Sequence, residues 1–189
     1  MDRPEGMPES LYKPRKDSLF LRESLLREEL EGRRVLDMGT GSGILAEAAV
    51  EQDAEVTAAD INREAVEYVE ERLEDVEAVE SDLFDDIEGE FDLVVFNPPY
   101  VPVGREMGDE EERAWSGGER GREITDRFLD GLDSHLADDG TVLLLQSSRN
   151  DPEETIEKFR EKSFEAEVVK REKIPWEELV VIRASANTF

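Results

Sequence analysis

Four consecutive residues after a strongly apolar run, Asn97-Pro98-Pro99-Tyr100, carry the clearest chemical signal in the sequence. Pro98 disfavours a helical conformation at Asn97, and neither proline has an N–H, so the chain should leave the preceding strand in a stiff, extended form. The side-chain oxygen of Asn97 and the carbonyl of Pro98 are then two acceptors for one NH₂ group, and Tyr100 offers a ring that can stack on it. This arrangement favours a planar nitrogen as the reacting group. An ordinary proline-rich strand exit is the alternative.

A glycine-rich turn is the second segment that could serve chemistry. Gly39, Gly41 and Gly43 follow the short apolar run Val35-Leu36 and precede a helical pattern. Glycines let a ligand approach the backbone, as at nucleotide sites in the first strand-to-helix turn of α/β proteins. A dinucleotide fingerprint would need a glycine where Ile44 stands. The spacing therefore predicts a cofactor site of another kind, with a plain tight turn as the alternative.

Two aspartates follow the next two expected strands. Asp60 stands 21 residues after Gly39, where a carboxylate can accept hydrogen bonds from both hydroxyls of a ribose. Asp82 comes just past the third expected strand and can accept from an adenine amino group, with Leu83 packing on the ring. In so acidic a chain, either aspartate could instead be a solvated loop residue. Their order after successive strands favours an adenosine site.

Strands and helices alternate along most of the chain, which is typical of a parallel sheet. We expect a helix that Asp17 caps and Gly32 ends, further helices over 42–51, 62–73 and near 120–137, and strands over 35–36, 56–59, 76–79, 91–96 and 141–145. The strand-like runs 165–174 and 178–184 are joined so closely that they must form an antiparallel pair. The sequence therefore predicts one α/β domain over residues 1–189, beginning with an irregular arm over 1–16.

The charge balance is extreme, because 50 acidic residues stand against 23 basic ones, for a net charge of −27. The acids are spread along the whole chain. This indicates a surface adapted to molar salt, where a Debye length of about 3 Å screens the self-repulsion. An acidic interaction face is the alternative. Such a surface disfavours nucleic acid as a partner, although the same screening weakens that argument.

Several kinds of site and location are disfavoured. The chain has no cysteine and one histidine, His135, so we expect no metal site of its own. His135 itself should lie at the surface or at a helix end, without a catalytic role. No apolar run approaches the ~20 residues that cross a bilayer, and no secretory signal opens the chain. We therefore expect a soluble, cytoplasmic protein.

Together these residues resemble the HemK-type class I methyltransferases. The resemblance rests on an ordered set of motifs: Asp37, Gly39, Gly41, Gly43, Asp60, Asp82 and Asn97-Pro98-Pro99-Tyr100. Residues 12–18 and the motifs Ala114-Trp115-Ser116-Gly117-Gly118, Gly121-Arg122-Glu123 and Asp126-Arg127-Phe128 are similar to the short archaeal and eukaryotic branch. Only 34 residues precede the first expected strand, so the N-terminal helical domain of the bacterial branch is not expected. Lys13 and Lys16 depart from the acidic residues usual in that arm.

The resemblance implies a Rossmann-like fold with a seven-stranded, mostly parallel sheet, and S-adenosylmethionine as cofactor. It implies transfer of a methyl group to the glutamine in the Gly-Gly-Gln loop of a class 1 peptide-chain release factor. It also implies that Asn97, Pro98, Pro99 and Tyr100 bind the substrate nitrogen. The residues implied to hold the cofactor are Ser18, Asp37, Gly39, Gly41, Asp60, Ile61, Asp82, Leu83 and Asn97.

Enzymes of this branch work with a small zinc-binding activator subunit, so the resemblance implies a heterodimer. The short strand expected near 76–79 would lie at a sheet edge, where another chain can pair with it. Adenine N6 methylation of DNA or RNA is the runner-up function, since that amine is also planar, and protein lysine methylation is a third. No basic stripe or separate target-recognition domain supports nucleic acid. A dehydrogenase and a non-catalytic binding module are rivals from other classes; the latter leaves residues 97–100 unexplained.

Overall fold

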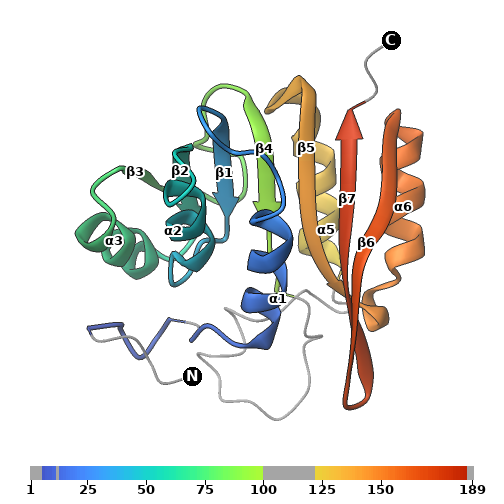
Figure 1. The fold of residues 1–189 in the computed structure, drawn as a ribbon, viewed down its shortest axis with the longest axis horizontal. Helices are drawn as coiled ribbons and strands as arrows, with labels where there is room; N and C mark the ends of the chain where they lie inside the picture. The colour runs from blue at the N-terminus through green and yellow to red at the C-terminus, as the bar shows by residue number, and fades with distance from the viewer. Residues whose placement is uncertain (1–5, 12, 100–121, 187–189) are drawn as a thin grey trace.

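The computed structural model describes residues 6–11, 13–99 and 122–186. Its centre is a seven-stranded sheet with the order β3-β2-β1-β4-β5-β7-β6 (Figure 1). The strands are β1 (Arg34–Met38), β2 (Glu55–Asp60), β3 (Val76–Glu80), β4 (Phe91–Phe96), β5 (Leu136–Ser147), β6 (Phe164–Ile174) and β7 (Glu177–Ala186). The helices are α1 (Lys16–Leu25), α2 (Ile44–Val50), α3 (Arg63–Arg72), α5 (Glu123–Gly131) and α6 (Pro152–Glu161), with short 3-10 turns η1 (Leu132–Ser134) and η2 (Ser148–Asn150).

Strand pairing confirms the predicted α/β fold. The strands β1 to β5 pair in parallel, whereas β7 is antiparallel to both β5 and β6. The last pair of the β6–β7 hairpin is Ile174 with Glu177, so only two residues form its turn. This short turn explains the antiparallel pairing, because a parallel crossover needs a dozen or more residues.

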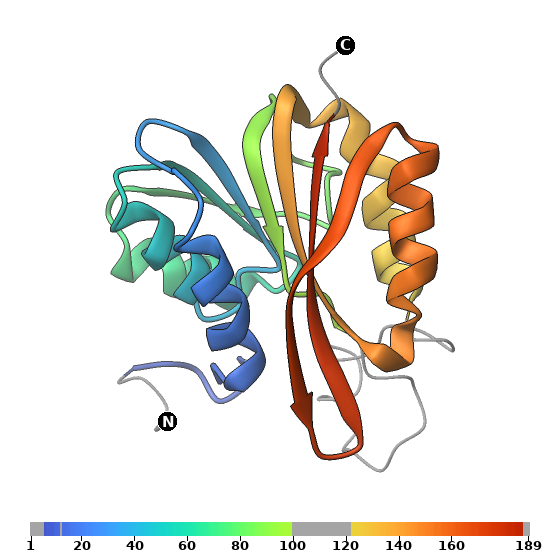
Figure 2. The same ribbon diagram turned by 45° about the vertical axis from the view of Figure 1, so that its right-hand side comes forward.

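Helices cover both faces of the sheet, as Figure 2 shows, with α1, α2 and α3 on one side and α5 and α6 on the other. Leu93 and Val95 of β4 face a core that includes Phe20 and Leu45, whereas their neighbours on the strand face a second core. The second core includes Val94, Phe96, Phe128, Leu144 and Phe159. Burial on both faces explains why β4 is apolar throughout and does not alternate with polar residues. No helix in the described part of the chain is long and apolar enough to span a membrane.

Two helices differ from the expectation. Helix α1 begins at Lys16 with Arg15 as N-cap and ends at Leu25, so Asp17 lies inside the first turn instead of capping it. Leu30 is buried beyond the helix end. Helix α6 was not predicted, although Asp151 caps it and Pro152 is its first residue, a combination that favours a helix start.

Candidate active site

The register of the sheet brings the ends of three strands side by side. Met38, the last residue of β1, pairs with Ala59 on one side and with Phe96 on the other. The residues that follow these positions are Gly39, Asp60 and Asn97. All three therefore lie along the edge of the sheet that the carboxyl ends of its parallel strands form, as distinct from the edge strands β3 and β6. Ligands of open α/β sheets bind at these carboxyl ends.

The glycine-rich turn is tied to β2 through Asp60. Asp60 Oδ2 accepts a hydrogen bond from the Gly41 N–H at 2.9 Å, and Asp60 Oδ1 accepts from the Asn62 N–H at 2.8 Å. Burial raises the pKa of Asp60, while these backbone donors oppose the shift. Each carboxylate oxygen has a second lone pair, so Asp60 can still accept from a ligand while it holds the turn.

Gly39 and Gly41 both have positive φ, 65° and 52°, which favours glycine. A Cβ on Gly39 would lie 3.2 Å from the ring of Phe96, so a side chain at this position would press on the end of β4. A Cβ on Gly41 would meet nothing closer than the Gly39 carbonyl at 4.0 Å. The turn thus packs closely against the sheet at Gly39 and leaves space over Gly41 for a ligand.

Asp37 is fully buried beneath this turn. Its Oδ2 accepts from Thr40 Oγ1 at 2.7 Å and from the Ala46 N–H at 3.0 Å. Its Oδ1 is buried and has no hydrogen-bond partner among the described residues. Burial raises the pKa of Asp37 to about 7, the two hydrogen bonds oppose this, and the charge of Asp60 adds to it. One oxygen of Asp37 is therefore free to accept from a donor, most strongly from a cation.

Asn97 is half-buried where β4 ends, and Pro98 after it is buried. The Asn97 Oδ1 atom is buried without a hydrogen-bond partner within the described part of the chain. A buried amide oxygen without a donor is costly unless a ligand supplies one. Pro99 is half-buried, and Tyr100, the fourth residue of the predicted motif, lies outside the described residues.

Asp82 lies in a tight turn after β3. Ser81 Oγ donates to the Leu83 carbonyl at 2.8 Å and accepts from the Asp86 N–H at 3.0 Å. Leu83 has a φ of 56°, which is uncommon for a branched residue and is typical of functional sites. Asp82 Oδ2 is paired with Arg127 of α5 at 3.0 Å. No local pattern in the sequence predicts this partner, although Arg127 belongs to a motif of the resemblance.

Ser18 and Ile61 are the two remaining residues that were predicted to hold the cofactor. Ser18 is buried in the first turn of α1, and its N–H donates to Asp17 Oδ1 at 2.8 Å. In Figure 1, α1 begins below the carboxyl ends of β1 and β4 and runs up to their level. Ile61, directly after Asp60, is 68% exposed, so its side chain offers an apolar surface beside that carboxylate.

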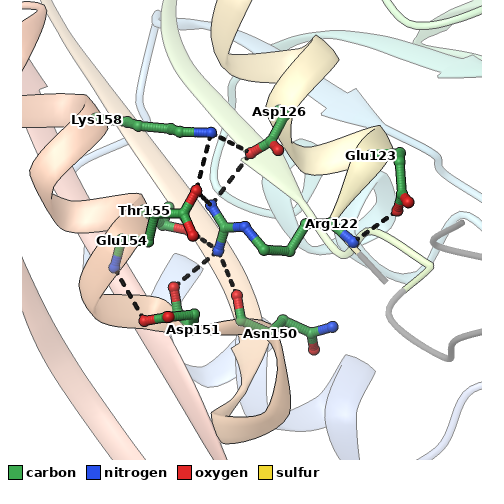
Figure 3. Close-up of polar contacts among 8 residues, drawn as sticks. All are labelled: Arg122, Glu123, Asp126, Asn150, Asp151, Glu154, Thr155 and Lys158. Atoms are coloured by element: carbon green, nitrogen blue, oxygen red, sulfur yellow. Dashed lines mark hydrogen bonds and ion pairs between the residues drawn. The ribbon is translucent and has the colours of Figure 1, made fainter. Parts of the chain in front are cut away.

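Arg122, the first described residue after the gap at 100–121, is buried among polar groups (Figure 3). Its guanidinium donates to the Asn150 and Asp151 carbonyls and to Thr155 Oγ1, and it pairs with Asp126 at 3.1 Å. It thereby ties the start of α5 to the start of α6. Phe128 on α5 packs its ring 4.8 Å from that of Phe96, so this anchored helix also supports the end of β4.

Other residues singled out in the sequence lie apart from this edge or outside the described residues. His135 follows the 3-10 turn η1 and stacks on Phe84, with 4.6 Å between ring centroids. The motif residues 114–118, Gly121 and Tyr12 are among those not described. The chemistry at the edge thus rests on three carboxylates, one unpaired amide oxygen and the open space over Gly41, which suit a cationic ligand that donates hydrogen bonds.

Residues 15–174 match the methyltransferase small domain family. A protein of Methanocaldococcus jannaschii named as a protein N5-glutamine methyltransferase is 36% identical over 92% of this chain and 91% of its own length. A release factor glutamine methyltransferase of Deinococcus radiodurans is 36% identical over 82% of this chain, which spans 60% of that protein.

A solved structure is similar over nearly the whole described fold. It is the E. cuniculi Mtq2-Trm112 complex, described as responsible for methylation of the eRF1 translation termination factor. Its matching chain is 32% identical to this one, with a TM-score of 0.79. The match covers 94% of this chain and 99% of that chain.

Proposed function

The chain belongs to the methyltransferase small domain family and is related to its HemK-type enzymes, and from this premise we propose that it methylates the glutamine in the Gly-Gly-Gln loop of a class 1 peptide-chain release factor. The proposed methyl donor is S-adenosylmethionine, and the proposed acceptor atom is the side-chain nitrogen of that glutamine. A cytoplasmic location and a working range in molar salt are part of the same proposal.

The observation that carries this proposal is the buried, unpaired Oδ1 of Asn97 at the end of β4. A primary amide has two N–H donors on one nitrogen, and an acceptor fixed at a strand end can hold one of them. The Pro98 carbonyl is the proposed acceptor for the other. The names of the relatives support glutamine as the acceptor residue.

The residues at the carboxyl ends of the parallel strands fit S-adenosylmethionine. When bound, this cofactor supplies a methyl group on a positively charged sulfur. Asp60 is proposed to accept from the ribose hydroxyls, and Asp82 from the adenine amino group, beside Leu83 and Ile61. Asp37 Oδ1, which is buried without a partner, suits the ammonium group of the amino acid part. Gly39 and Gly41 would let the ligand lie against the backbone, and Ser18 would close the site from α1.

Asn97 and Pro98 would act by orienting the substrate. An amide nitrogen is a poor nucleophile because its lone pair is delocalised into the carbonyl. Holding both of its hydrogens would aim the lone pair at the methyl group. The new N–C bond would replace the bond between methyl and sulfur, and the nitrogen would lose its proton to solvent only as that exchange occurs. Such alignment can contribute about 7–11 kcal/mol to the lowering of a barrier. No strong base is required at the site.

A second subunit is proposed to bind along β3. This strand pairs only with β2 within the described residues, so its other edge can accept a strand from another chain. The E. cuniculi relative was solved as a complex with Trm112, which supports a heterodimer here. The proposed partner is a small zinc-binding activator.

The test is mass spectrometry of candidate substrates after incubation with S-adenosylmethionine in molar KCl. The release factor of the same cell is compared with its Gly-Gly-Gln to Gly-Gly-Asn variant and with duplex DNA. A gain of one methyl group on the loop glutamine alone supports the proposal. Methylated adenine or lysine beside an unmodified glutamine would replace it with one of the two alternatives.

A further inference from the structure

The turn between β6 and β7 presents a tryptophan to solvent. Trp176 is 91% exposed, more than any other large apolar residue in the described part of the chain. It also has a φ of 77° and follows Pro175, and glycine is favoured at this position of a turn that begins with proline. Both the backbone strain and the exposed indole oppose stability, so packing among the described residues does not explain Trp176.

The turn is held firmly by the end of β5 and the 3-10 turn η2. Arg149 Nη2 donates to the Trp176 carbonyl at 3.0 Å, and the Glu178 N–H donates to Ser148 Oγ at 3.0 Å. Ser147 Oγ also donates to the Glu177 carboxylate. The indole is therefore displayed on a fixed support, which lowers the entropy lost when a partner binds it.

The hairpin projects beyond the edge of the sheet that carries the candidate active site (Figures 1 and 2). Phe96 pairs with Leu144, and the following residue, Leu145, pairs with Val181. Trp176 lies in the turn just before β7 and precedes Val181 by five residues. At strand dimensions it therefore lies about 17 Å further out than Asn97 and about 10 Å to the side. A small cofactor cannot span this separation, whereas a folded protein that inserts a loop at Asn97 can.

The charges around Trp176 point to an acidic protein. Lys173 precedes Trp176 by three residues, and Arg149 donates to the Trp176 carbonyl; neither cation forms an ion pair within the described residues. These two cations belong to the hairpin and its support on a molecule whose net charge is −27. A partner from the same high-salt environment would share an acidic surface. Two of the carboxylates near the turn are already engaged, because Glu178 pairs with Arg171 and Glu177 accepts from Ser147 Oγ.

We infer that Trp176, with Arg149 and Lys173, is the docking surface for the body of the methyl-accepting protein, the part outside its Gly-Gly-Gln loop. This inference rests on the proposed function for the identity of the partner. The indole fills an apolar depression on that protein, the two cations meet carboxylates around it, and the loop reaches Asn97.

The test compares the kinetic constants of the wild-type chain with those of Trp176→Gly. Both are assayed as the heterodimer if the chain forms one. Glycine removes the indole and suits the turn, so this variant should unfold at the same temperature or higher. We expect KM for the intact release factor to rise about tenfold, which corresponds to a loss of about 1.4 kcal/mol of binding free energy. The values of kcat and of KM for S-adenosylmethionine should stay within twofold of wild type. Val169→Thr, which changes an exposed apolar residue on β6, is the matched control and should leave all three constants unchanged.

Direct binding of the release factor, measured by calorimetry, separates this inference from the proposed function. A release factor that binds wild type but not Trp176→Gly, and is never methylated, leaves the docking surface standing and refutes the proposed reaction. An unchanged KM and affinity in Trp176→Gly, a fall in kcat alone, or lost affinity only for a single-stranded RNA would each overturn the docking surface. Absence of any binding to wild type would overturn both.

Discussion

Arg127 on α5 and Asp82 after β3 form an ion pair of 3.0 Å at the edge of the sheet, although they are 45 residues apart in the chain. The pair occupies one carboxylate oxygen of Asp82 and leaves the other for a ligand. Both side chains are about half exposed. Arg127 is therefore placed to orient the carboxylate proposed to accept from adenine.

The first prediction concerns this pair. Arg127→Met should weaken S-adenosylmethionine binding about 1.4- to fivefold, since an exposed ion pair contributes about 0.2–1 kcal/mol. In an Asp82→Asn background the same change should have no further effect, because its partner is gone. Calorimetric titration of the four proteins measures the coupling. Additive losses would show that Arg127 acts without Asp82. Lys162→Met, which breaks an ion pair at the far end of α6, is the control.

The second prediction concerns pH. An aspartate in the unfolded chain has a pKa near 3.9, whereas burial raises that of Asp37 to about 7. Between about pH 4 and 7 the folded state keeps a proton that the unfolded state releases, so the stability from this group is complete below pH 4 and is lost as the pH rises to 7. Relative to Asp37→Asn, the unfolding free energy of wild type should fall by up to about 1.4 kcal/mol per pH unit in this window. Urea denaturation at fixed KCl measures it, and parallel pH curves would refute it.

The third prediction concerns the buried guanidinium of Arg122. Arg122→Met removes the donor to two backbone carbonyls and leaves Asp126 paired with Lys158 alone, so the free energy of unfolding should fall by about 3 kcal/mol. Arg127→Met on the same helix removes only a half-exposed pair and should cost less than about 1 kcal/mol. Urea denaturation of both variants in the same salt makes the comparison. Equal losses would mean that burial of Arg122 contributes nothing beyond its charge.

The fourth prediction concerns Asn97. Asn97→Ala removes the proposed acceptor for the substrate amide, so kcat should fall by about 10²- to 10³-fold, on the scale of losing one positioned hydrogen-bonding group. Asn97→Asp keeps an acceptor oxygen and should retain more activity. Turnover is measured with the intact release factor, and melting temperatures check the fold. A folded Asn97→Ala protein with normal kcat would remove Asn97 from the proposed mechanism.

The fifth prediction concerns the free edge of β3. Ala78→Pro removes a backbone donor from this strand and should weaken association with the activator subunit at least tenfold, while S-adenosylmethionine binding stays within twofold. Co-expression followed by size-exclusion chromatography reports the heterodimer. Undiminished co-purification of this variant would place the second subunit elsewhere.

The parallel core and the C-terminal hairpin could be predicted because they depend on local signals. Uniformly apolar runs such as 91–96 mark strands buried on both faces, and a two-residue turn leaves one way to pair its strands. Helix α6 escaped prediction because its apolar residues are few, even though Asp151 and Pro152 mark its start. The end of α1 was misplaced since Leu30 continues the apolar pattern but is buried from a loop.

The sequence could predict that the candidate residues lie close together, but not the contacts that they make. Asp37, Asp60, Asp82 and Asn97 stand at or just after the carboxyl ends of successive strands, so a parallel sheet places them at one edge. The bond from the Gly41 N–H to Asp60 and the Arg127–Asp82 pair join segments distant in sequence, and one sequence carries no local signal for such pairs. The burial of Arg122 depends in the same way on α6.

The strained turn at Trp176 has a consequence for laboratory evolution. A library of this chain selected only for resistance to heat or urea should enrich glycine at residue 176, because the exchange relieves the backbone and removes an exposed ring. The selected variants would still bind S-adenosylmethionine and would melt at a higher temperature. They would, however, bind their protein substrate weakly at cellular concentrations. Selection for turnover of the whole release factor should restore the tryptophan from the same library, so residue 176 would distinguish the two selections.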